Sequence, residues 1–198
     1  MNIFYLDEDP RQCAEWMVDK HVVKMILETA QLLSTAHRYI DGLEVRLELE
    51  KNGRTRKKSV WVLDDDRNDV LYNCTHINHP SAIWTRESVS NYNWLVDHLF
   101  ALGDEYTFRY GKKHETIRKL GWLISSPPHG LREWDWTTPP SAMAEEYIIG
   151  EDPIQNYRNY YKHGKASMHA WKNRQPPPWI IDWSVGQPWL RTYDGARE

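Results

Sequence analysis

One segment near the N-terminus carries several side chains with acid–base chemistry on a single helical stripe. Along residues 19–33, DKHVVKMILETAQLL, these side chains lie three, four and three residues apart: His21, Lys24, Glu28 and Gln31. At 100° per residue these four and Thr35 fall within an arc of about 80°. Polar groups beside apolar surface must find partners or line a cavity. The stripe predicts either the wall of an active site or a solvent face made of Lys20, Lys24, Gln31, Ser34 and Arg38.

A second polar stripe is expected on a long helix that begins at Ser81. It borders an apolar face and consists of Glu87, Asn91, Trp94, His98, Glu105 and Arg109. If the two helices pack side by side, both stripes face one cleft. Carboxylates, imidazoles, amides and a flat indole in one cleft suit the binding of a base or nucleotide and acid–base chemistry on it.

Two further motifs concern histidines and cations. THINHP contains His76 and His79, and we expect them to cap a helix, to hydrogen-bond or to contact a phosphate, because a lone HxxH rarely specifies a metal. We expect no metal and no cofactor, and the chain has no P-loop, Rossmann, nucleophile-elbow or HExxH motif. FRYGKKH closes the long helix with Arg109, Lys112 and His114, which either complement the helix dipole or bind phosphate.

The elements that must position these groups indicate a mainly α protein, one helical domain over residues 1–198 with a short N-terminal strand and a β-hairpin insertion. Hydrophobic periodicity and capping signals predict a strand at 2–6, a helix from Pro10 to about Arg38 with a break near Asp19, and a hairpin at 43–63 turning at Asn52–Gly53. A helix of moderate length is expected after Asp66, followed by the long helix from Ser81 to Gly111, a short helix at 113–123 and a loop through 125–143. The last expected elements are a helix at 153–173 with Gly164 as a weak point and a Pro- and Trp-rich tail at 175–198 packed on the helices.

Composition limits the classes of function. The formal net charge of −3 and the pI near 6.3 exclude a strongly basic DNA-coating protein, but not a local basic groove. Basic residues at the hairpin tip form either a solvated turn or a finger that touches nucleic-acid backbone: Arg54, Arg56, Lys57 and Lys58. The 11 Trp and 11 Tyr residues suit a core or a pocket that stacks on flat ligands.

The expected compartment is the cytoplasm. Cys13 and Cys74 lie far apart and form no CxxC, so neither a disulfide framework nor a zinc ribbon is indicated. The first ten residues do not read as a signal peptide, and no stretch approaches the roughly 18 apolar residues of a membrane span. The sequence does not specify an oligomeric state.

Several segments together resemble a family of small bacteriophage proteins. They are NIFYLDEDP, DKHVVKM with QLLSTAHR, HPSAIWTRES, NYNWL, DEYTFRYGKKH and NYRNYYKHGKASMHAWKNR, and they span most of the chain apart from the 43–63 hairpin. We associate this type of protein with helical DNA-glycosylase-like proteins and with phage enzymes of thymine hypermodification. The resemblance implies an enzyme that processes a base in DNA.

The leading hypothesis is therefore a DNA glycosylase that cleaves the N-glycosidic bond of a modified or damaged base, with extruded or single-stranded DNA as partner. The expected carboxylate is Glu28 or Asp19, and its expected partner is His21 or Lys24. Lys24 or Lys20 is an alternative as a Schiff-base nucleophile. Asp7 follows the predicted strand and is a further catalytic candidate, with helix capping as its alternative role.

The remaining candidates are assigned to substrate binding. Base contacts are expected from Trp84, Asn91 and Trp94. Phosphate contacts are expected from Arg109, Lys112 and His114. Further substrate contacts are expected from Gln31, Arg86, Glu87, His76, His79 and Tyr110.

Two other classes of function fit the sequence. An enzyme acting on free nucleotides or on a base-hypermodification precursor, such as a transferase, suits the near-neutral charge better than DNA binding does. A non-enzymatic phage or host interaction protein would present exposed aromatics, for example in 127–140. Salt-dependent DNA binding favours the first hypothesis, stabilisation by nucleotides the second, and a stable protein partner without either effect the third.

Overall fold

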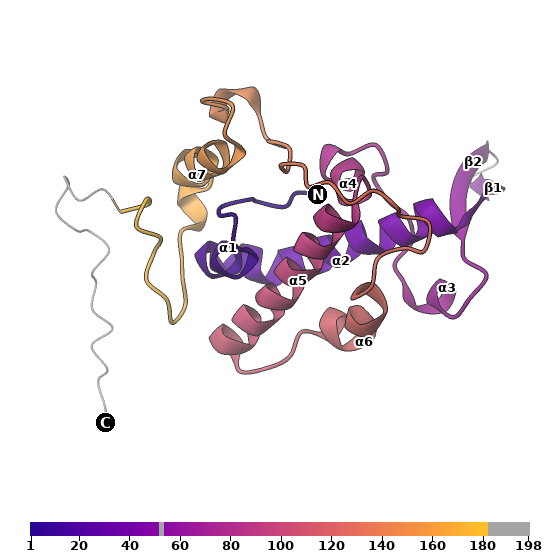
Figure 1. Cartoon of the computed structure of the whole chain (residues 1–198), viewed down its shortest axis with the longest axis horizontal. Coiled ribbons are helices and arrows are strands. Elements are labelled where there is room, and N and C mark those ends of the chain that lie inside the picture. The colour runs from indigo at the N-terminus through magenta and orange to yellow at the C-terminus, as the bar shows by residue number, and fades with distance from the viewer. Residues whose placement is uncertain (52–53, 182–198) are drawn as a thin grey trace.

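A computed structural model describes residues 1–51 and 54–181. The described part is mainly helical, with one two-stranded antiparallel hairpin, as the sequence predicts (Figure 1). In chain order the elements are α1 (Pro10–Trp16), α2 (Asp19–Asp41), β1 (Leu43–Lys51), β2 (Arg54–Val62), α3 (Arg67–Val70), α4 (Pro80–Thr85), α5 (Val89–Tyr110), α6 (Glu115–Ile124), the 3-10 turn η1 (Glu145–Tyr147), α7 (Pro153–Gly164) and the 3-10 turn η2 (Ala166–Met168).

Helices α2 and α5 form the centre of the molecule. They pack on each other, α1 packs on α5, and α4 and α6 pack on α2 (Figure 1). They bury apolar residues such as Met25, Leu32, Leu95 and Leu99, and polar pairs such as His37 and Tyr92 also join the two helices. None of the helices among the described residues combines the length and apolar character that a membrane span requires.

The predicted breaks near the N-terminus are confirmed. Asp9 caps α1 by accepting a 2.9 Å hydrogen bond from the Arg11 amide, and Pro10 occupies the first turn. The chain leaves the helical conformation at Met17 and Val18 before α2 begins at Asp19. At the far end of α5, Gly111 adopts the left-handed conformation with φ 70°, which favours glycine over residues with a Cβ.

The hairpin of residues 43–62 is also confirmed. Leu43 pairs with Val62 at its base and Lys51 with Arg54 at the far end, so the predicted Asn52–Gly53 turn lies outside the described residues. The basic side chains of β2 are exposed, and Lys57 lies 3.6 Å from Glu48 on the opposite strand. The predicted tail is described only as far as residue 181, where Trp179 packs edge-on against Trp16.

The predicted N-terminal strand at 2–6 is wrong. Residues 3–6 are buried, but they form no ladder, and Phe4 has a φ of 55°. Side chains take the place of a partner strand: Asn2 Oδ1 accepts from the amides of Ile3 and Phe4, and Cys13 Sγ bonds both the Leu6 amide and the Phe4 carbonyl. An apolar run indicates burial but not a strand when its neighbours in space are helices.

Three predicted helix lengths are also wrong. The long helix from Ser81 divides into α4 and α5, because Ser88 interrupts it and caps α5 by accepting from the Asn91 amide at 3.1 Å. The helix predicted at 153–173 ends at Gly164, where an added Cβ would lie 2.6 Å from the Tyr160 ring and 2.7 Å from Tyr147. The helix after Asp66 is the single turn α3.

A buried arginine joins the elements around the start of α2. Arg109 of α5 is 2 % exposed, and its guanidinium donates to Glu105 Oε1 at 2.6 Å and Asp19 Oδ1 at 2.8 Å. It also donates to the main-chain carbonyls of Glu15 and Met17. Asp19 in turn accepts from the Lys172 amide, which ties the segment after α7 to the same point.

We expect Arg109→Met to lower the free energy of unfolding by about 3 kcal/mol, because it removes the donor to Asp19 and two buried carbonyls and leaves the carboxylate of Glu105, which is 3 % exposed, with Arg174 as its remaining cation. Urea unfolding followed by circular dichroism measures this loss. Arg118→Met is the matched control, since the Arg118–Glu115 pair lies in solvent, and it should leave stability nearly unchanged. Equal losses in the two variants would contradict a central role for Arg109.

Candidate functional site

The predicted stripe of α2 does not lie in one environment. Lys24 is exposed, Glu28 and Gln31 are half-buried, and His21 and Thr35 are buried. The alternative of a solvent face is also only partly right, because Ser34 and Arg38 are buried while Lys20 and Lys24 are exposed. The stripe therefore passes from the core, at His21, to a half-open surface around Glu28.

His21 is part of the core. Its ring stacks on Phe4 with centroids 4.2 Å apart, and its Nδ1 lies 2.5 Å from the hydroxyl of Tyr161. Burial, assisted by the charges of Lys165 and Lys24, lowers the pKa of His21 from 6.5 to about 3. The imidazole is neutral at physiological pH and holds α2 against the N-terminal segment and α7.

Glu28 is a half-buried carboxylate with amines near both of its oxygens. Its side chain is 14 % exposed, and Oε1 lies 2.9 Å from Lys24 Nζ. The amino nitrogen of Met1 lies 4.0 Å from Oε2. Glu28 thus lies between two amines at the edge of the core.

The loop before α4 contacts α2, the helix that carries Glu28. The Thr35 hydroxyl of α2 bonds the main chain of Thr75, and it accepts from the Thr75 amide at 3.2 Å. His79 caps α4 through Nδ1, which accepts from the Ser81 amide. Its pKa is lowered by burial and by the charges of the Met1 amine and His76, while the carboxylate of Glu28 acts in the opposite direction. Glu28 pairs with Lys24 and the Met1 amine, and the charges of Glu28, the Met1 amine and His76 all act on His79, so we call these five groups the Glu28 cluster: the Met1 amine, Lys24, Glu28, His76 and His79.

His76 adds a sign of backbone strain to the Glu28 cluster. It is exposed and has a φ of 50°, which is uncommon for a residue with a Cβ, and its Nδ1 lies 2.7 Å from the Thr75 hydroxyl. Such conformations gather at functional sites when the surrounding contacts fix them. Among residues 1–51 and 54–181, no three His, Cys, Asp or Glu side chains converge as a metal site would require.

Within residues 1–51 and 54–181, the polar side chains of the α5 stripe bond partners other than the α2 stripe. Asn91 is fully buried and bonds the Trp84 carbonyl and both the amide and hydroxyl of Thr137. Glu87 accepts from the same hydroxyl at 3.1 Å, and Trp84 donates to the Thr137 carbonyl at 2.7 Å. These three expected substrate contacts fasten the 133–138 segment to α4 and α5.

The remaining candidates are divided between structural and exposed positions. Arg109 is enclosed by protein acceptors, and His114 caps α6 by accepting from the Thr116 amide. Arg86 lies 4.3 Å from the centre of the Tyr39 ring, and the Tyr110 hydroxyl is 3.5 Å from the Asp19 carbonyl. Lys112 is exposed on the turn after α5.

The other two acidic candidates are also engaged. Asp19 holds Arg109 and the Lys172 amide, and Asp7 lies 3.2 Å from Arg158 of α7 and accepts from the Asp9 amide. Both carboxylates join segments that are distant in the sequence. Their geometry accounts for them without a ligand.

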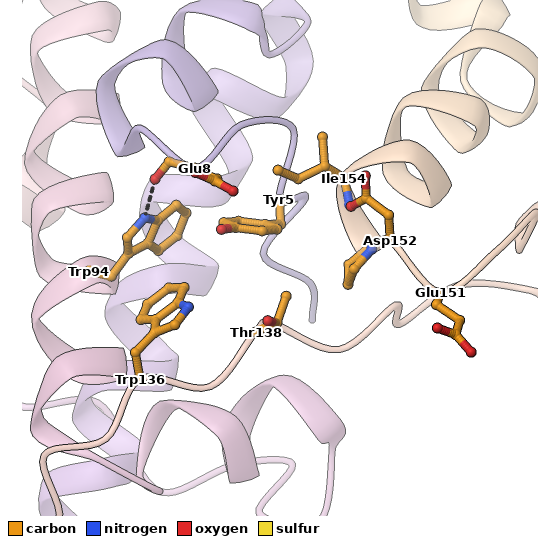
Figure 2. Close-up of a pocket in the computed structure, with 9 residues that line it drawn as sticks. Tyr5, Glu8, Trp94, Trp136, Thr138, Glu151, Asp152 and Ile154 are labelled. Carbon is orange, nitrogen blue, oxygen red and sulfur yellow. Dashed lines mark hydrogen bonds between the residues drawn. The ribbon is translucent and has the colours of Figure 1, made fainter.

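A pocket of about 630 Å³ opens elsewhere, between the N-terminal segment, α5 and the start of α7 (Figure 2). Its wall contains three aromatic rings and three acids: Tyr5, Trp94, Trp136, Glu8, Glu151 and Asp152. Thr138, Pro153 and Ile154 complete the lining. Only Trp94 was expected from the sequence. Tyr5 lies in the segment predicted as a strand, and the sequence alone assigns no role to Glu8, Glu151 or Asp152.

No family model, curated protein or solved structure matches the chain. The assignment of a function therefore rests on the chemistry of the Glu28 cluster and of the pocket. The resemblance to phage proteins stays a prediction.

Burial of His21 predicts a specific acid sensitivity. The pKa of His21 is about 3 in the folded protein, against its ordinary value of 6.5 in the unfolded chain. As the pH falls, the unfolded chain therefore takes up this proton before the folded protein does. The stability associated with neutral His21 is complete above pH 6.5 and is lost progressively toward pH 3. His37 and His98, whose pKa values burial lowers to about 4, contribute in the same direction.

We expect His21→Asn, which keeps a polar group near Tyr161, to reduce the fall in melting temperature between pH 7 and pH 4. Thermal unfolding across this range measures the slope. His163→Asn, at an exposed histidine of α7, is the control and should follow the wild type. An unchanged slope in His21→Asn would show that His21 is not neutral in the folded protein.

Proposed function

We propose that this protein cleaves the N-glycosidic bond of a modified or damaged base in DNA, with Glu28 as the catalytic carboxylate. The observation that carries the proposal is the position of Glu28: a half-buried carboxylate paired with two amines, whose charge also acts on the imidazole of His79. Asp7 and Asp19 pair with arginines of distant segments, whereas the partners of Glu28 among residues 1–51 and 54–181 are the amines of Lys24 and Met1.

Hydrolysis of an N-glycosidic bond needs a carboxylate near C1′ and a proton donor to the base, and the Glu28 cluster contains both kinds of group. The bond between C1′ and the base nitrogen breaks, the base leaves with a proton, and an oxygen from water bonds to C1′. A carboxylate can stabilise the cationic sugar and remove the proton of the attacking water. Of the two imidazoles in the cluster, the exposed ring of His76 is the proposed proton donor to the departing base, because burial lowers the pKa of His79 and its Nδ1 caps α4.

An amine offers a second route, in which nitrogen replaces water at C1′ and forms a Schiff base. A nucleophilic lysine is usually desolvated, but the side chain of Lys24 is 67 % exposed. This favours water as the nucleophile over Lys24. The Met1 amine is the other amine within reach of Glu28.

Basic residues near the cluster provide contacts for the DNA backbone. Lys24 of α2 and Lys165 at the end of α7 both lower the pKa of His21, so both charges act on the same part of the molecule. Lys20 lies one turn before Lys24 and is exposed. A local group of cations of this kind binds phosphate despite a net charge of −3.

We expect Glu28→Gln to lower base release by at least about 100-fold, because general acid–base groups typically contribute that much or more. The purified protein would be incubated with DNA carrying natural, glucosylated, hydroxymethylated and damaged bases, and mass spectrometry would detect freed bases and abasic sites. Glu44→Gln, at an exposed acid of β1, is the control and should retain full activity. Release that persists in Glu28→Gln would transfer the catalytic role to another carboxylate.

Reduction with borohydride distinguishes the two routes. If water attacks, no protein–DNA adduct forms, and Lys24→Ala changes the binding of DNA more than the rate of release. A trapped adduct would overturn the water route, and peptide mapping would assign the bond to Lys24 or to the Met1 nitrogen.

Absence of release from every DNA would reject the glycosylase proposal. The second candidate is then a non-enzymatic interaction protein, which the exposure of Trp134 (68 %) and Trp136 (43 %) in the predicted 127–140 region favours. Loss of a partner on Trp134→Ala would support that function.

A further inference from the structure

The pocket of Figure 2 has walls that are well fixed. Trp94 donates from its indole nitrogen to the Glu8 carbonyl at 2.7 Å, and its ring stacks on the buried His98 with centroids 5.1 Å apart. Tyr5 is 3 % exposed, and its ring lies 5.2 Å from Trp94. Trp136 closes the group at 6.3 Å from Trp94 and 6.5 Å from Tyr5.

The three rings are inclined to one another. The interplanar angles are 69° for Tyr5 and Trp94, 52° for Trp94 and Trp136, and 45° for Tyr5 and Trp136. Mutually inclined rings enclose a rounded group from several sides, whereas a flat base would stack on the face of only one of them. Faces of Trp and Tyr attract cations through the ring quadrupole.

The polar part of the pocket carries only negative charge. Figure 2 shows Glu8 and Asp152 to either side of Tyr5, with Glu151 beyond Asp152. None of the described residues that line the pocket is a Lys, Arg or His. Burial and the carboxylates of Glu8, Asp7 and Asp152 raise the pKa of Tyr5 to about 12, so the phenol stays neutral. Phosphates are repelled here, and cations are attracted.

We propose that this pocket binds a small organic cation with a rounded, alkylated ammonium group. The rings of Tyr5, Trp94 and Trp136 receive its methyl or methylene surface, and Glu8 and Asp152 balance its charge. The walls of Pro153 and Ile154 add apolar contact. This site is separate from the Glu28 cluster, and the inference holds whether or not the protein is a glycosylase.

Choline and its neutral isostere 3,3-dimethyl-1-butanol test the proposal by isothermal titration calorimetry on the full chain. We expect choline to bind at millimolar or lower concentration, and the isostere at least about tenfold more weakly, because only the cation gains from the rings and the carboxylates. Equal affinity for the two, or no binding of choline at millimolar concentration, would overturn the proposal.

Variants assign the binding to this pocket. Trp136→Ala should weaken choline about tenfold, since it removes one ring from the wall. The matched control is Trp134→Ala, because Trp134 is exposed two residues away and does not line the pocket. Equal losses in these two variants would overturn the assignment.

Charge variants complete the test. Asp152→Asn and Glu8→Gln should each weaken choline several-fold and leave the isostere unaffected; asparagine keeps the cap that Asp152 makes on α7. Glu146→Gln, at an exposed acid outside the pocket, should have no effect. If Asp152→Asn and Glu8→Gln both bind choline like the wild type, the carboxylates do not contribute and the proposal fails. Glu28→Gln should bind choline normally, which keeps the outcome independent of base release.

Discussion

Two guanidinium groups shut away from water determine how the segments around α2 meet. Such a group retains its charge, so each of its N–H bonds must find an acceptor inside the protein. Arg109 donates hydrogen bonds to two carbonyls and two carboxylates near the beginning of α2. Arg38 does the same near its end, where it donates to the carbonyls of Trp61, Asn68, Leu71 and Tyr72. Loops without regular structure are thereby held at defined places.

This arrangement explains which parts of the structure could be predicted from the sequence. Local signals placed α1, α2, α6 and the hairpin, because a cap, a helical period or an Asn-Gly turn depends on a few adjacent residues. The burial of Arg38 and Arg109 depends on acceptors that lie far away in the sequence. Both read as surface or ligand-binding cations until those acceptors are known. Ser88 carried a usable cap signal, and the apolar pattern on both sides of it obscured the break.

The same distinction applies to the candidate residues. Glu28 and the histidines of the THINHP segment were recognisable by residue type, and the fold brings them together. His21, Asp19 and Asn91 have equally versatile side chains, yet their polar atoms are engaged in packing. Residue type indicates which chemistry a side chain is capable of. Whether the side chain can contact a ligand depends on how many of its polar atoms are already bonded within the fold. The N-terminal segment contributes to both sites, with Met1 in the Glu28 cluster and Tyr5 and Glu8 in the pocket. The proposed ligands differ in charge: anionic DNA at the cluster and an organic cation in the pocket.

The hairpin has a different relation to the rest of the molecule. Its first and last residues, Leu43 and Val62, pair with each other, and most of its described side chains are exposed. The chain therefore leaves the core and returns to it at nearly the same point. A change in the length or sequence of this arm alters little that the core can sense, so the arm can diverge, or accept a grafted peptide, while the helices keep their arrangement.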